Sequence, residues 1–204
     1  MTNEGKLIHE RRWYAPRRHS AEVLPAIEEL LTISGVAKTD LRLIVSCVGP
    51  GGYTGLRVGI SVAKTLAYAL GIGCVGVDRL FADAAGRLRG DEPVCAVHRA
   101  GRKDLAVAIY KGTIDDTTEV RAPALIPIAD LPHVLPGPSI VTGEIPEELM
   151  TALAEGGHDA WPGIGGQRRP WLLARLGLRA VAEGADTNPQ ALLPVYLRSP
   201  VQEP

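Results

Sequence analysis

Residues 49–57 read GPGGYTGLR, and this glycine-rich stretch lies between an apolar run and a helix-like run. Backbone N–H groups of such a loop, together with a helix N-terminus, bind phosphate in many proteins. A Walker loop carries Lys and then Ser or Thr after its last glycine, whereas Leu56 and Arg57 follow Gly55 here. Pro50 also removes one N–H donor. We therefore favour a tight strand-to-helix turn over a nucleotide cradle. This glycine loop comprises Gly49, Gly51, Gly52, Thr54 and Gly55.

A stripe of small residues follows the loop. Gly55, Gly59, Ala63 and Ala67 recur every four residues within the helix expected over residues 54–70. Residues four apart lie on one side of a helix, and small side chains there allow another backbone to approach closely. Two interpretations stay open: the stripe packs against the chain's own sheet, or it forms a helix-to-helix interface with another protein.

Other candidate catalytic or metal-binding residues are scattered. None of the five histidines has the HExxH spacing of a zinc protease, and His19 with Glu22 is too small a set for a metal site. Ser61 in GISVA faintly resembles a nucleophile elbow, but it falls inside the expected helix. We therefore expect no catalytic residue and no metal site in this chain.

The stretch RRWYAPRR, residues 11–18, combines four arginines with Trp13 and Tyr14. Arginine next to aromatic residues suits RNA, through phosphate contacts and base stacking. A solvated loop at a strand edge explains the same composition, and we favour that interpretation.

The composition sets broad limits. The 204 residues are 46% hydrophobic and carry a net charge of −1, which argues against binding nucleic acid through overall charge. Three cysteines without a CxxC spacing favour buried thiols in a reducing compartment. The sequence has no signal peptide and no apolar run of about 18 residues, so we expect a cytoplasmic protein with no membrane contact.

The pattern of apolar residues predicts an α/β protein. A helix over 21–34 is capped by Ser20, strands cover 41–48 and 73–77, and a short helix follows Asp78 as far as Leu88. Strand–helix–strand order favours a parallel sheet. Later come a hairpin turning at Gly101, a Pro-rich interruption over 123–138, a strand over 139–143, helices over 146–157 and 170–184, and an extended tail over 194–200. We expect two lobes, residues 1–90 and 91–204.

Three stretches in the same order resemble the TsaB (YeaZ) family. They are RRHSAEVLPAIEELL, then DLRLIVSCVGPGGYTGLRVGISVAKTLAYALGIGCVGVDRL, and finally PVYLRSP. The family's usual loop reads GPGSFTGLR, and here it reads GPGGYTGLR. The resemblance implies the two-lobed fold of the actin-like ATPases and sugar kinases. It also implies a non-catalytic relative of TsaD, the subunit that transfers a threonylcarbamoyl group.

The implied function is that of a scaffold subunit. The complex would make N6-threonylcarbamoyladenosine at position 37 of tRNAs reading ANN codons, with TsaD as direct partner and the ATPase TsaE joining them. A homodimer would form when TsaD is absent, and tRNA would be reached only through the complex. No cofactor is expected in the isolated chain, while a nucleotide at the shared interface stays open. The alternatives are a small-molecule kinase or ATPase of the same fold, and a glycoprotease-like peptidase.

The resemblance also implies a partner surface in the N-terminal lobe. The sequence departs from the family pattern in three respects. The family begins with a strand resembling ILALDTS, and Met1 stands where that strand should have ended, so we expect this lobe to lack its first strand. Arg99 and Ala106 replace an Asp and a Tyr of the family, and Gly52 and Tyr53 replace Ser and Phe. The expected surface comprises His19, Leu24, Ile27, Leu31, Gly55, Gly59, Ala63 and Ala67.

Overall fold

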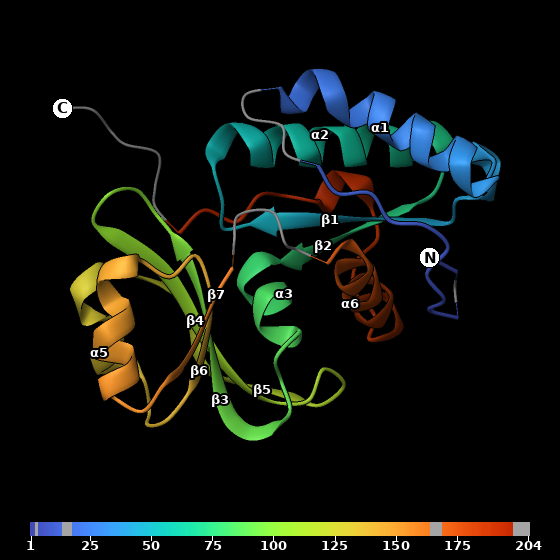
Figure 1. The fold of residues 1–204 in the computed structure, drawn as a ribbon. Coiled ribbons are helices and arrows are strands. Elements are labelled where there is room, and N and C mark those ends of the chain that lie inside the picture. Colours follow the sequence, from blue (N-terminus) through green and yellow to red (C-terminus); the bar gives the residue numbers. More distant parts are fainter. Residues whose placement is uncertain (3, 14–17, 164–168, 198–204) are drawn as a thin grey trace. The chain divides into compact units, whose positions relative to one another are not determined.

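The chain folds into two compact α/β units in a computed structural model that describes residues 1–2, 4–13, 18–163 and 169–197 (Figure 1). Unit 1 combines Met1–Asp78 with Arg168–Val195, and unit 2 combines Arg79–Gln167 with Tyr196–Pro204. The expected two lobes are thus present, but with different boundaries from the predicted division at Gly90. The helix that begins at Arg79 packs on the sheet of unit 2, and the last long helix packs on the sheet of unit 1.

Unit 1 is built on two parallel strands, β1 (Leu43–Gly49) and β2 (Gly73–Asp78). Helices α1 (His19–Ser34) and α2 (Tyr53–Leu70) form a layer on one side of this sheet, and α6 (Pro170–Ala182) covers the other (Figure 1). The far edge of β2 is closed by a short segment, because the Cys74 N–H donates to the Thr187 carbonyl at 2.8 Å. The parallel pairing of β1 with β2 confirms the predicted parallel sheet.

Glycines end both helices of the outer layer. Gly35 and Gly71 adopt the left-handed conformation, each with φ of 64°, and their N–H groups donate to carbonyls of the last helical turn. At its start α1 differs from expectation. It begins at His19 after Arg18, no side chain caps it, and Ser20 lies inside the helix rather than before it.

Unit 2 is built on a five-stranded sheet with the order β5-β4-β3-β6-β7. Strands β3 and β4, and β4 and β5, pair antiparallel, whereas β3 and β6, and β6 and β7, pair parallel. The bounds are β3 Gly90–Arg99, β4 Asp104–Gly112, β5 Thr117–Pro127, β6 Ile140–Gly143 and β7 Asp159–Pro162. The first helix of the unit, α3 (Arg79–Ala85), is followed by shorter helical segments: α4 (Leu131–Val134) and α5 (Met150–Glu155).

Strand β3 has a core on each of its faces. Val94 and Ala96 lie in a core with Leu80 of α3, while Cys95 and Val97 lie in a second core with Leu153 of α5 and other buried residues. All four β3 side chains are fully buried. This two-sided burial explains why the sequence here is a continuous apolar run rather than an alternating one.

Candidate functional site

The glycine loop between β1 and α2 is shaped by the chain's own C-terminal segment. Gly49 has φ of 116°, and a Cβ built on it would lie 2.6 Å from the Val195 carbonyl oxygen. The Val195 N–H donates to the Val48 carbonyl at 2.7 Å. Only glycine fits at position 49, because the backbone conformation and this close approach both exclude a side chain. The loop thus has a structural reason for its first glycine, in line with the strand-to-helix turn.

The small-residue stripe of α2 divides into two halves. Ala63 and Ala67 are buried in a core of unit 1, together with Ile60 of the same helix, Cys74 of β2 and Leu192. Their assignment to a partner surface is therefore corrected, because they face the sheet of their own unit. The alternative that remained open, internal packing, describes this half of the stripe.

The other half of the stripe is more accessible. Gly55 and Gly59 are half-buried, and a Cβ built on Gly59 would have no heavy atom within 4 Å. On the same helix Tyr53 and Tyr68 are exposed, Tyr68 to 77%. The Arg57 guanidinium lies 5.0 Å from the centroid of the Tyr53 ring.

Helix α1 carries the remaining residues of the predicted surface. Leu24 is exposed, and Ile27 and Leu31 are half-buried; the side chain of His19 lies outside the described residues. Ile33, which was not among the predicted residues, is exposed to 60%. The outer helices α1 and α2 together present large apolar side chains to solvent: Leu24, Ile33, Tyr53 and Tyr68.

The arginine-rich segment before α1 contacts this helix through carboxylates. Arg11 pairs with Glu29, and the Trp13 indole N–H donates to Glu22 at 3.1 Å. Residues 14–17 lie outside the described part of the chain. Arg11 and Trp13 thus have intramolecular partners, which favours a structural role over the RNA interpretation.

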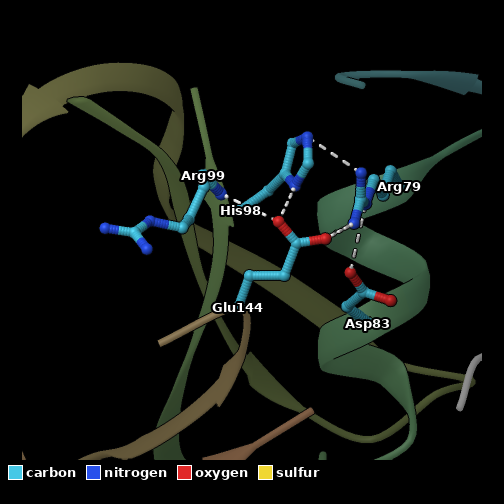
Figure 2. Close-up of polar contacts among 5 residues, drawn as sticks. All are labelled: Arg79, Asp83, His98, Arg99 and Glu144. Atoms are coloured by element: carbon cyan, nitrogen blue, oxygen red, sulfur yellow. Dashed lines mark hydrogen bonds and ion pairs between the residues drawn. The ribbon is translucent and has the colours of Figure 1, made fainter. Parts of the chain in front are cut away.

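A cluster of charged side chains lies in unit 2, where the sequence patterns had indicated no site (Figure 2). Glu144 directly follows β6, and its Oε1 accepts from the Nη2 of Arg79 at 2.6 Å. Its Oε2 accepts from His98 Nδ1 at 2.7 Å and from the Arg99 backbone N–H at 3.2 Å. Arg79 Nη1 lies 2.9 Å from His98 Nε2, and Arg79 Nε lies 3.6 Å from an Asp83 carboxylate oxygen.

These contacts determine the charge state of the Glu144 carboxyl. Burial raises its pKa, but the hydrogen bond from His98 and the charge of Arg79 outweigh burial and lower the pKa from 4.5 to about 2. The carboxylate is therefore ionised at neutral pH. Arg79 is only 6% exposed, so this carboxylate neutralises an almost fully buried cation.

The sequence contains only part of the signal for this cluster. His98 is the second-last residue of strand β3 and Glu144 follows strand β6, and these strands are parallel. The carboxyl ends of parallel strands meet at one edge of the sheet, where polar side chains gather. The pairing of β3 with β6 is what brings these residues together, and it cannot be read from either strand alone.

One family model matches most of the chain, and curated relatives match parts of it. The family model described as TsaD, tRNA N6-adenosine threonylcarbamoyltransferase, matches residues 13–148. The tRNA threonylcarbamoyladenosine biosynthesis protein TsaB of Bacillus subtilis is 34% identical over 111 residues, which are 54% of this chain and 48% of the relative. TsaB of Escherichia coli is 38% identical over 74 residues, 36% of this chain and 32% of the relative. The chain thus spans less than half of the length of either curated relative.

A solved structure supports the same relationship across both units. YeaZ from Pseudomonas aeruginosa matches with a TM-score of 0.74 and 26% identity, covering 91% of this chain and 87% of the solved one. The chain belongs to the TsaB (YeaZ) family. As in that family, its fold is that of the actin-like ATPases, which agrees with the expected fold class.

Within the described residues, no three His, Cys, Asp or Glu side chains gather as a metal-binding group. None of the described helices has the length and apolarity needed to cross a bilayer.

Proposed function

We propose that this chain acts in tRNA threonylcarbamoyladenosine biosynthesis as a non-catalytic subunit that binds TsaD. The observation that carries the proposal is the layer of α1 and α2, which exposes large apolar side chains from both helices: Leu24, Ile33, Tyr53 and Tyr68. Exposed apolar and aromatic residues on adjacent elements are typical of protein interfaces. The names of the TsaB relatives support the pathway.

The local geometry suits a helix-to-helix contact. Gly59 lies between the two exposed tyrosines along α2, and the space above its Cα is open. A partner helix could therefore approach the α2 backbone at Gly59, while Tyr68, nine residues further along and so on the opposite side of the helix, would make a separate contact. The proposed surface comprises Leu24, Ile27, Leu31 and Ile33 of α1, and Tyr53, Gly55, Gly59 and Tyr68 of α2.

The rest of the assembly follows from the same proposal. TsaE joins the pair, tRNA binds the complex rather than this chain alone, and a nucleotide can occupy the shared interface. Without TsaD, two copies of the chain pair through the α1 and α2 layer.

The test is co-expression with TsaD of the same organism, followed by size-exclusion chromatography with light scattering. We expect a heterodimer with the unchanged chain. Tyr68→Asp should weaken binding by about tenfold or more, because it places a charge in an apolar contact. Val120→Asp is the matched control, since Val120 is an exposed apolar residue of β5 in unit 2.

The outcomes test the binding of TsaD and the proposed α1 and α2 surface separately. If the unchanged folded chain never binds TsaD, the proposed function fails. If it binds and Tyr68→Asp binds equally well, the partnership holds and the α1 and α2 surface is wrong. Magnesium-dependent ATP turnover by the isolated chain would instead favour an enzyme of the same fold.

A further inference from the structure

The two ring nitrogens of His98 have partners of opposite kinds. Nδ1 lies 2.7 Å from a carboxylate oxygen of Glu144, which can only accept. Nε2 lies 2.9 Å from Nη1 of Arg79, which can only donate. Both contacts are satisfied together only when Nδ1 carries the proton and Nε2 has a free lone pair. The geometry therefore requires the neutral Nδ1–H form of His98.

The contact joins three elements of unit 2. Arg79 is the first residue of α3, His98 lies on β3, and Glu144 follows β6 (Figure 2). Arg79 is also the residue at which unit 2 begins after Asp78. Its buried guanidinium contacts His98 of β3 and Glu144, the residue after β6. These two acceptors thus hold the start of α3 on the carboxyl ends of β3 and β6.

Other charged groups surround the imidazole. Asp83, one turn along α3, lies 3.6 Å from the Nε of Arg79. Arg99 of β3 donates its backbone N–H to Glu144, while its guanidinium points away from the cluster (Figure 2). That guanidinium lies 3.6 Å from a carboxylate oxygen of Glu148. The cation nearest to Nε2 is therefore Arg79, and the anion nearest to Nδ1 is Glu144.

We propose that Arg79, His98 and Glu144 form a proton-sensitive clasp, which holds the start of α3 while His98 is neutral and loosens when His98 gains a second proton. A second proton on Nε2 would face the Arg79 N–H donor, so two donors and two positive charges would stand at hydrogen-bond distance. The imidazolium keeps its contact with Glu144, and Arg79 moves away. Histidine is the side chain whose charge most readily changes near neutral pH, so the clasp is tested by comparing the protein at two pH values.

The first test reads the proton positions directly. Nitrogen-15 NMR of the histidine rings at about pH 7.5 should show His98 with a proton on Nδ1 and none on Nε2. His133, which is exposed on α4, is an internal reference for a histidine outside the clasp. A proton on Nε2 at this pH, alone or together with one on Nδ1, would overturn the proposal.

The second test reads the consequence for α3. Amide hydrogen exchange of residues 79–88, corrected for the intrinsic rate, should lose protection by about threefold or more between pH 7.5 and 5.5. His98→Gln keeps one donor and one acceptor but does not gain a proton, so its protection should not change with pH. His133→Gln should behave as the unchanged chain. Equal protection of the unchanged chain at both pH values, or the same pH response in His98→Gln, would refute the clasp.

Discussion

Gly177 of α6 lies directly against Val45 of β1. A Cβ built on Gly177 would stand 2.4 Å from a methyl carbon of Val45, closer than real side-chain atoms approach. This contact joins a helix near the end of the chain to a strand near its beginning, and it gives a reason for a glycine in the middle of a helix, where it costs about 1 kcal/mol relative to alanine.

Gly177→Ala should therefore destabilise unit 1. We expect a loss of about 1–3 kcal/mol in the free energy of unfolding, because the added methyl group overpacks the contact with Val45. Urea denaturation followed by circular dichroism measures it. The control is Gly59→Ala, because a Cβ at Gly59 would enter open space. The higher helix propensity of alanine should raise the free energy of unfolding there by up to about 1 kcal/mol. Equal stability of both variants would contradict the close contact.

Ala63→Leu tests on which side of α2 the small residues pack. Ala63 is buried in the core with Ile60 and Leu192, so a larger side chain should lower the free energy of unfolding by about 1–3 kcal/mol. Thr65→Leu, at an exposed position of the same helix, should change it by less than about 0.5 kcal/mol. If the Ala63→Leu variant were as stable as the unchanged chain but no longer bound TsaD, Ala63 would belong to the partner surface and not to the core.

Glu144 should make stability depend on pH in the acid range. Its pKa is lowered from 4.5 to about 2 in the folded chain, so the folded state binds fewer protons than the unfolded state between these values. The stabilisation is complete above about pH 4.5 and is lost as the pH falls towards 2. Glu144→Gln should cost about 1–2 kcal/mol at pH 7, allowing for partial solvent screening, and flatten this dependence.

The control for Glu144 is Glu148→Gln, because Glu148 is exposed and its contact with Arg99 is long, at 3.6 Å. Thermal unfolding at several pH values between about 3 and 7 distinguishes the two variants. The role assigned to the buried carboxylate would be wrong if both variants followed the pH profile of the unchanged chain.

The cysteines should differ sharply in reactivity. Burial raises the pKa of the Cys95 thiol to about 12 and also raises the pKa of the Cys74 thiol, whereas Cys47 is only half-buried. A thiol reagent at about pH 8 should modify Cys47 at least tenfold faster than Cys95 in the folded chain. Cys47→Ser should remove the fast phase, and its persistence in that variant would contradict the burial pattern.

Local patterns were sufficient for the elements of unit 1. Helix α2 was expected over residues 54–70 and spans Tyr53–Leu70, because the glycine loop and Gly71 mark its two ends. The parallel pairing of β1 and β2 follows from the strand–helix–strand order. In unit 2 the strand β5 was missed, since Pro123 and Pro127 lie within it and were interpreted as an interruption. Strand β5 accommodates them because it is an edge strand of the sheet and its register with β4 is irregular next to Pro123.

Features that depend on long-range packing were beyond the reach of such patterns. A small-residue stripe shows that something packs closely, but the burial of Ala63 and Ala67 beside Leu192 depends on where the C-terminal segment returns. The division into units likewise depends on the return of α6 to β1. The charged cluster exists because the pairing of β3 with β6 brings His98 and Glu144 together, and α3 then places Arg79 in contact with both. Short-range periodicity specifies which side of an element is buried, whereas the partner of that side is set by contacts between residues far apart in the chain.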